Sequence, residues 1–328
     1  MTAPGEVLDV ATRFVDTVDA VDAVRPFGRG HINETFLVAT RSGEYVLQRV
    51  NSTVFVDVDA VMRNIRCVDL HMNGRLVPEL VGASGPWRMW RRVPEADPVT
   101  HPTPRTVASA GALLGRFHAL LADLEPTILT ETLPDFHAPA RRLDALHRAI
   151  ATNRRGRAEM ARGEIATVLA AAPLAERADA LTNAVPLRVA HYDAKLDNVL
   201  FRGEDAVCLV DLDTLMPGAW FWDVGDLLRT AATPAAEDDA EHSVIEPGLY
   251  AATLDGYRRA AADVLDATEL DALDDAGALV TFEQAVRFLT DWLDGDVYYR
   301  TSRPDQNLDR ARAQLRLLST MPTTVRWS

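Results

Sequence analysis

One short segment of the chain gathers residue types that could transfer a phosphoryl group. It reads HYDAKLDN from 191 to 198, and a predicted β-hairpin then returns the chain to Asp211. This spacing would present Asp193 to a substrate hydroxyl and bring Asn198 and Asp211 together at the two ends of the hairpin. Their hard oxygen atoms suit Mg²⁺ better than zinc or copper. Because phosphoryl transfer depends on positioning and on neutralising charge, these three side chains are candidates for that chemistry.

The same segment has more ordinary interpretations as well. Asp193 alone could cap a turn, although its spacing from Asn198 and Asp211 favours a catalytic role. We expect His191 to brace the loop rather than to carry a proton. We expect Asp213 to accept a hydrogen bond near the metal rather than to bind the metal itself.

Alternating residues earlier in the chain predict a small sheet. The runs 35–39 and 45–50 have the apolar alternation and the short glycine turn of a β-hairpin. Residues 87–93 predict another strand. Two further segments, 6–24 and 56–73, carry apolar residues at helical intervals. We therefore expect residues 1–93 to form a small α+β lobe with the hairpin at its centre.

A proline-rich stretch separates this unit from the rest of the chain. Four prolines occur within residues 94–104, and such a stretch continues neither a helix nor a central strand. We place the connection between two lobes there, with residues 94–328 forming the second. That second lobe is predicted to be mostly helical, apart from two short strands at 198–201 and 207–212. The predicted helices are 108–121, 139–151, 157–171, 249–264, 276–293 and 308–318.

The composition excludes several classes of protein. The 328 residues include 34 Lys and Arg against 48 Asp and Glu, a net charge of −14 at pH 7, which argues against non-specific binding to nucleic acid. Only Cys67 and Cys208 occur, at a spacing unsuited to zinc or redox chemistry. No apolar run approaches the roughly 20 residues that cross a bilayer, and the N-terminus lacks a signal-peptide pattern. We expect a cytoplasmic protein without membrane or nucleic-acid partners.

The loop at 191–198 resembles the catalytic loop of protein-kinase-like small-molecule kinases, the aminoglycoside and choline kinase superfamily. The segment GALLGRFHAL, at 111–120, resembles the first helix of that superfamily's larger lobe. A closer similarity, to bacterial N-acetylhexosamine 1-kinases, rests on the segments 30–35, 45–51, 210–218, 222–229 and 287–299.

This resemblance implies a bilobal α+β fold, with ATP in the cleft between a sheet-based lobe and a helical lobe. It also implies that Asp193 is the catalytic base and that Lys195 approaches the γ-phosphate, with a solvated surface lysine as the less favoured alternative for Lys195. Asn198 and Asp211 would be the ligands of Mg²⁺.

The glycine loop before the first hairpin departs from the protein-kinase pattern. Gly28 and Gly30 have no third glycine after them, so an ordinary β-turn is an alternative to a phosphate-binding loop. His31 and Asn33 follow in the same loop. We expect them to reach either the sugar or the γ-phosphate.

The lysine that usually pairs with the α- and β-phosphates is also missing. In its place the second strand of the hairpin carries Gln48 followed by Arg49. A strand turns only one of two successive side chains toward the cleft. If Arg49 faces inward it replaces the lysine; the resemblance favours Gln48, and then another cation must meet the phosphate charge.

Five residues are candidate contacts to the acceptor substrate. Asp226 and Arg229 fit a salt bridge as well as they fit a sugar contact, and Trp292 could fill the core instead of stacking on a sugar ring. The resemblance to the hexosamine kinases favours Arg287 and Tyr298 as sugar contacts. The expected reaction is the ATP- and Mg²⁺-dependent phosphorylation of a sugar, at the anomeric hydroxyl of an N-acetylhexosamine.

Two alternatives to that reaction stay open. The acceptor could be an aminoglycoside, choline, homoserine or a different monosaccharide, and the acidic run at 237–241 could attract a cationic one. The chain could also be an inactive relative that only binds nucleotide. The complete set of Asp193, Asn198 and Asp211 argues against that second alternative.

Overall fold

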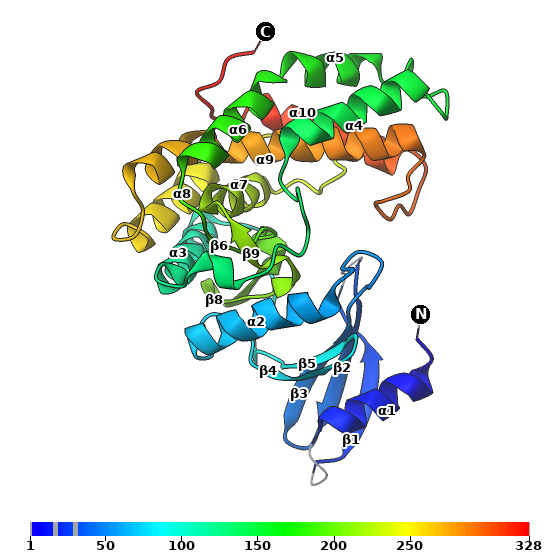
Figure 1. Cartoon of the computed structure of the whole chain (residues 1–328), viewed down its shortest axis with the longest axis vertical. Helices are drawn as coiled ribbons and strands as arrows, with labels where there is room; N and C mark the ends of the chain where they lie inside the picture. The colour runs from blue at the N-terminus through cyan, green and yellow to red at the C-terminus, as the bar shows by residue number, and fades with distance from the viewer. Residues whose placement is uncertain (1, 16–18, 29–31, 328) are drawn as a thin grey trace.

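The computed structural model describes residues 2–15, 19–28 and 32–327. A small sheet with two helices lies at one end of the molecule, and helices make up most of the other end (Figure 1). The predicted α+β architecture, with a small antiparallel sheet and a helical remainder, is confirmed. Gly30 and His31, both expected in the nucleotide loop, lie outside the described residues.

The sheet has five antiparallel strands in the order β1-β2-β3-β5-β4. Strand alternation separates its two faces. Tyr45 and Leu47 pack on one face against the N-terminal helix α1, whereas Val46 joins the core on the other face, which α2 covers. The elements are α1 (Pro4–Phe14), β1 (Val21–Pro26), β2 (Glu34–Thr40), β3 (Gly43–Arg49), α2 (Val58–Met72), β4 (Leu80–Ser84) and β5 (Trp87–Arg91).

The prediction of a single helix over 6–24 is wrong beyond Phe14. Helix α1 ends at that residue, and Val21–Pro26 forms β1, which pairs antiparallel with β2. β1 lies at the edge of the sheet, where a proline such as Pro26 is tolerated. Its pairing with β2, rather than its own apolar spacing, therefore decides its conformation.

The helical part is organised around the long helix α9, which is buried along most of its length. Helices α4, α7 and α10 pack directly on it. The predicted helices are confirmed, and the structure adds α6 and α7, which the sequence analysis did not identify. The bounds are α3 (Pro104–Leu121), α4 (Pro139–Thr152), α5 (Arg162–Ala170), α6 (Pro173–Ala184), α7 (Trp220–Ala231), α8 (Pro247–Ala260), α9 (Ala267–Asp294) and α10 (Gln306–Leu318).

Two short two-stranded sheets lie between α6 and α7. β6 (Arg188–Ala190) pairs with β9 (Met216–Gly218), and β7 (Val199–Arg202) pairs with β8 (Asp205–Leu209). Single turns of 3-10 helix, Leu196–Asn198 and Leu212–Thr214, flank the second pair. The predicted hairpin at 198–212 is thus confirmed. No helix of the described residues is long and apolar enough to cross a bilayer.

Glycines bring α3 and α8 into close contact. A methyl group on Gly111 would overlap the carbonyl oxygen of Thr253, and one on Gly256 would overlap the carbonyl oxygen of Ala108. The two helix backbones therefore meet without side chains between them. This contact explains why glycine stands in the helix that the sequence analysis compared with the superfamily.

We expect Gly111→Ala to lower the free energy of unfolding by about 1–3 kcal/mol, because the added methyl group forces the two helices apart. Gly163→Ala, in α5, is the matched control because nothing lies within 4 Å of a Cβ built there. Urea denaturation of both variants measures the difference. Equal stability of the two variants would show that α3 moves away from α8 without cost.

Candidate active site

Helix α7 holds the loop that carries Asp193. The carboxylate of Asp223, in the first turn of that helix, accepts the backbone N–H groups of His191 at 2.7 Å and Tyr192 at 2.6 Å. His118 of α3 approaches the same carboxylate at 2.9 Å. Burial alone would raise the pKa of Asp223, but the hydrogen bond to His118 and the loop N–H groups hold that pKa below its ordinary value.

His191 braces the loop internally. Its Nδ1 accepts the backbone N–H of Asp193 at 3.2 Å, so the tautomer that satisfies both ring nitrogens donates from Nε2 to the carbonyl oxygen of Val210 at 3.0 Å. The ring is fully buried. These contacts tie the loop to the strand that leads into Asp211, and they agree with the expected bracing role.

Asp193 lies at the surface of this loop between two partners. The ammonium group of Lys195 donates to both its carboxylate oxygens, at 3.0 and 2.8 Å, and Asn198 Nδ2 donates to Oδ2 at 2.9 Å. Burial opposes the charge of Lys195, yet Asp193 and Asp211 outweigh it and hold the lysine pKa above its ordinary value. The carboxylate is thus oriented and kept beside a cation, while about a quarter of its side chain stays open to solvent.

Asn198 and Asp211 flank the same end of the β7–β8 hairpin. Val210 N–H donates to the Asn198 carbonyl at 2.9 Å, and Asp211 itself is exposed, with φ of 64°. Although the residue as a whole is exposed, nearby protein atoms keep water from its carboxyl and raise the pKa of Asp211 to about 7, and the charges of Asp213 and Asp193 act in the same direction. This crowding of negative charge favours a cation at that point.

The donor set fits Mg²⁺. No group of three His, Cys, Asp or Glu side chains placed to hold a metal occurs in the described part of the chain. Mg²⁺ does not require such a group, because in enzymes that use nucleoside triphosphates it is held by one or two protein oxygens together with phosphate oxygens and water. Asp211 and the amide oxygen of Asn198, whose Nδ2 is already engaged, could supply the protein share.

On the sheet, Gln48 and not Arg49 faces the helical lobe. Gln48 Oε1 accepts hydrogen bonds from Arg88 Nε at 2.9 Å and from Trp90 Nε1 at 3.0 Å. Arg49 points to the opposite face, where its half-exposed side chain donates to Thr2 Oγ1 at 3.0 Å. Arg49 therefore does not occupy the position of the missing lysine.

The sequence analysis missed Arg88 of β5. This residue lies directly opposite Gln48 in the sheet, is fully buried, and forms an ion pair with Asp213. Asn33 donates to the other oxygen of Asp213 at 2.6 Å. A signal was present in the sequence, because Arg88 is a charged residue between the apolar Trp87 and Met89, in a strand pairing with Gln48. Arg88 thus places a buried cation beside the inward Gln48, and the structure pairs that cation with Asp213.

The glycine loop is described only in part. Gly28 has φ of 79°, a backbone conformation that favours glycine, and a Cβ there would meet nothing within 4 Å. Asn33 Oδ1 accepts the backbone N–H of Asn51 at 3.0 Å, which fixes the end of the loop to the segment after β3. These contacts are compatible with both a turn and a nucleotide loop.

Arg287 of α9 lies among aromatic rings. Its guanidinium carbon is 5.5 Å from the ring centre of Phe136, 5.6 Å from Tyr299 and 6.0 Å from Tyr298. No hydrogen bond or ion pair of this guanidinium is present among the described residues. Burial opposes its charge, but Tyr299 and Glu283 outweigh it and raise the pKa of Arg287, with a smaller contribution from Asp193. The negative charge of Asp193 thus contributes to the electrostatic environment of Arg287.

Tyr298 lies in the loop after α9, and Asp291 fixes that loop. The Asp291 carboxylate accepts the backbone N–H groups of Val297, Tyr298 and Tyr299 at 2.9, 2.8 and 3.0 Å. The side chain of Tyr298 itself is 59% exposed. The structure thus places Tyr298 beside Arg287 with its ring free to contact a ligand.

Three expected acceptor contacts are corrected by the structure. Trp292 is fully buried and donates from Nε1 to Asp305 at 2.9 Å, so it belongs to the core. Asp226 and Arg229 are both buried and bind each other at 2.7 Å. Helical spacing places these side chains on α9 and α7, but both helices are buried on nearly every side, so position on a face does not mean access to the cleft.

Two of the four carboxylates in the acidic run at 237–241 form ion pairs with arginine. Glu237 pairs with Arg310 at 3.2 Å, Asp238 with Arg303 at 3.1 Å, and Asp239 lies 2.9 Å from His242. Part of the negative charge that could attract a cationic substrate is therefore already compensated within the chain.

The sequence profile of the phosphotransferase enzyme family matches residues 23–265, about three quarters of the chain. The chain belongs to this family. The prediction of an ATP-dependent kinase is thereby confirmed, and the chain is an ATP-dependent phosphotransferase that acts on a small hydroxyl substrate.

Solved structures share the fold of this phosphotransferase along nearly its whole length. Choline kinase from Streptococcus pneumoniae matches with a TM-score of 0.61 and 12% identity, covering 96% of this chain and 98% of that one. Aminoglycoside phosphotransferase APH(2'')-Ib, bound to ADP, has a TM-score of 0.60 and 13% identity over 98% and 100%. Choline kinase from Cryptosporidium parvum has a TM-score of 0.62 and 11% identity over 95% and 93%.

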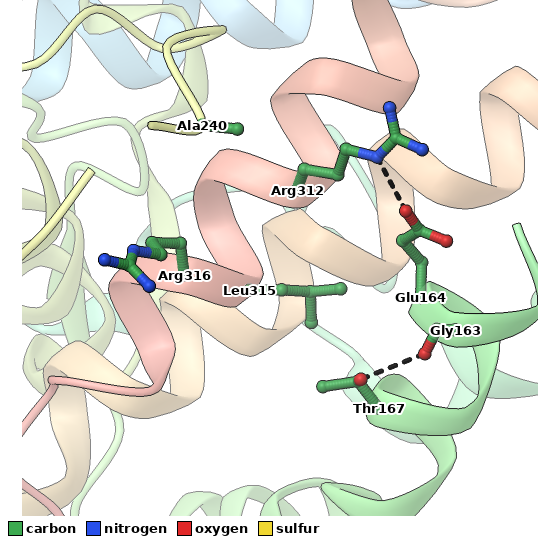
Figure 2. Close-up of a pocket in the computed structure, with 7 residues that line it drawn as sticks. All are labelled: Gly163, Glu164, Thr167, Ala240, Arg312, Leu315 and Arg316. Carbon is green, nitrogen blue, oxygen red and sulfur yellow. Dashed lines mark hydrogen bonds and ion pairs between the residues drawn. The ribbon is translucent and has the colours of Figure 1, made fainter. Parts of the chain in front are cut away.

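A hollow elsewhere on the phosphotransferase has no link to these residues. It lies between α5 and α10, where Arg312 Nε donates to Glu164 at 2.6 Å and Thr167 bonds back to Gly163 within α5 (Figure 2). None of the predicted site residues lines it, and we assign it no role.

Proposed function

We propose that the enzyme transfers the γ-phosphoryl group of ATP to the anomeric hydroxyl of an N-acetylhexosamine. Asp193 is the base, Asn198 and Asp211 hold Mg²⁺, and the loop around Gly28 and Asn33 covers the phosphates. The ADP bound to a phosphotransferase of the same fold supports the choice of nucleotide. When bound, Mg²⁺ would neutralise phosphate charge.

The contacts of Asp193 explain how this chain would activate the hydroxyl. Asn198 and Lys195 fix the carboxylate, so that one oxygen can accept a hydrogen bond from the incoming hydroxyl and take its proton. The ammonium group of Lys195 donates to both oxygens of this carboxylate, and it could also donate to an oxygen of the γ-phosphate. The capped loop holds these groups in place before substrate arrives, and this lowers the cost of reaching the transition state.

Arg287 carries the choice of acceptor. Its charged guanidinium, which forms no ion pair among the described residues, would disfavour a cationic substrate, such as choline or an aminoglycoside, and would donate hydrogen bonds to a neutral polyol or an acyl oxygen. Tyr298, exposed beside it, offers a ring face against which a sugar could pack. A neutral acetylated sugar suits both side chains.

The reaction is tested by measuring ADP release with Mg²⁺-ATP against a panel of acceptors. The panel holds N-acetylglucosamine, N-acetylgalactosamine, glucosamine, glucose, galactose, kanamycin, choline and homoserine, and ³¹P NMR locates the phosphate in any product. We expect an anomeric phosphate on an N-acetylhexosamine. Turnover with a cation alone would contradict the proposed acceptor and leave the proposed base and metal ligands in place.

Arg287→Met should raise the KM for the acceptor about 10- to 100-fold, because a hydrogen bond to a charged group is lost. The KM for ATP should stay unchanged. Arg258→Met is the matched control, since Arg258 pairs with Asp274 on the exposed face of α8. An unchanged acceptor KM in the Arg287 variant would place the sugar elsewhere.

A further inference from the structure

A buried ion pair joins the sheet to the metal-binding turn. Arg88 on β5 and Asp213 in the turn after β8 are 0% and 2% exposed, and 125 residues of sequence separate them. Burying two charges costs more desolvation free energy than a well-packed apolar pair, so stability alone is a poor explanation for this one. The burial of this ion pair is therefore better explained by a functional role than by stability.

The sheet holds the guanidinium in a fixed orientation. Gln48 accepts its Nε at 2.9 Å, and the indole ring of Trp90 lies 5.4 Å from its carbon. Neither Nη1 nor Nη2 has a hydrogen-bond partner that satisfies both distance and angle among the described residues. Nη1 forms the ion pair with Asp213 Oδ1.

A second contact reaches Asp213 from the same lobe. Asn33 donates to its Oδ2 at 2.6 Å, and the amide oxygen of Asn33 is itself held by Asn51 N–H. Asp213 is two residues beyond Asp211, within a turn whose first residue has the left-handed φ of 64°. Arg88 and Asn33 therefore both act on the segment that sets the direction of the Asp211 carboxylate.

We propose that Arg88 is a positioning residue that fixes the metal-binding turn from the small lobe. Its ion pair with Asp213, together with Asn33, holds Asp211 in the orientation that receives Mg²⁺ bound to the nucleotide. The proposal rests on the assignment of Asp211 as a metal ligand under the proposed function. It also explains how the chain works without a lysine on β3, because the cation is carried by the next strand and acts through Asp213.

The test compares ADP binding with Mg²⁺ and with EDTA, by titration calorimetry. We expect Arg88→Met to weaken Mg²⁺-ADP binding about 10- to 100-fold, the usual effect of losing a residue that orients a metal ligand. Binding of ADP in EDTA should change little. Arg88→Lys, which keeps the charge, should recover part of the loss. Arg91→Met is the matched control, because Arg91 lies on the same strand and pairs with exposed Glu79.

A double variant separates positioning from stability. Arg88→Met alone leaves Asp213 charged and buried, which can unfold the chain; Arg88→Met with Asp213→Asn removes both charges and should restore the melting temperature. We expect Mg²⁺-ADP binding to stay weak in this double variant. Recovery of that binding would overturn the proposal, since the pair would then serve stability alone.

Two further outcomes complete the test. An equal loss of ADP affinity with Mg²⁺ and with EDTA would also overturn the proposal, because Arg88 would then act directly on the phosphates. Wild-type protein that binds ADP equally in both conditions would instead refute the metal assignment within the proposed function. Asp193→Asn, which should bind Mg²⁺-ADP normally, shows that a loss of turnover alone does not change this measurement.

Discussion

Replacing Asp193 with Asn is expected to lower kcat at least ~10²-fold, because the amide cannot take the proton of the acceptor hydroxyl. The geometry makes this substitution informative. The carboxylate is bound by Lys195 and Asn198 at the surface of a loop whose backbone is held independently by Asp223. The loop should therefore keep its shape when one oxygen of Asp193 becomes an NH₂ group.

The measurement pairs steady-state ADP release with thermal denaturation. Asp197→Asn is the matched control, since Asp197 is an exposed carboxylate of the same loop. We expect that control to turn over normally, and we expect the Asp193 variant to melt like wild type and still bind Mg²⁺-ADP. Near-normal turnover in Asp193→Asn would refute its assignment as the base.

The second large effect is expected at Asp211. Asp211→Asn should weaken Mg²⁺-ADP binding more than about 10-fold, because the substitution removes the charged metal ligand itself. Stability should not fall. Burial of its carboxyl, together with the charges of Asp213 and Asp193, raises the pKa of Asp211, so its ionised form is disfavoured in the folded chain. Neutralising one of the three should leave the melting temperature unchanged or higher.

Calorimetry and a melting curve on the same preparation test both halves of this prediction. Asp205→Asn, at the exposed first residue of β8, is the control carboxylate on the same hairpin. A variant that binds Mg²⁺-ADP like wild type would exclude Asp211 from the metal site. A large drop in melting temperature would show instead that Asp211 has a structural role.

The parts of the site that were predictable from sequence are local ones. The loop at 191–198 and the hairpin after it keep Asp193, Asn198 and Asp211 within about twenty residues, so their spacing alone constrains their geometry. The strand alternation at 45–49 likewise limited the inward residue to Gln48 or Arg49. The sheet, and most helices, followed from the same short-range periodicities.

What could not be predicted depends on contacts between distant segments. The role of Arg88 depends on its ion pair with Asp213, and no periodicity of β5 indicates that partner. Trp292 was assigned to the substrate because of its residue type, but α9 is surrounded by other helices and buries it completely. Likewise β1 became a strand rather than a helix because β2 offered it an open edge.

The position of α9 along the chain has a consequence for evolution. The match to the family profile ends at residue 265, and α9 begins at Ala267, so Arg287 and Tyr298 lie outside the part by which the family is identified. Asp193, Asp211 and nearly all of the sheet lie inside the matched residues. With the acceptor assignment proposed above, selectivity and catalysis occupy separate stretches of sequence. Mutation and recombination near the C-terminus can therefore change what the enzyme phosphorylates while the machinery that cleaves ATP is inherited intact.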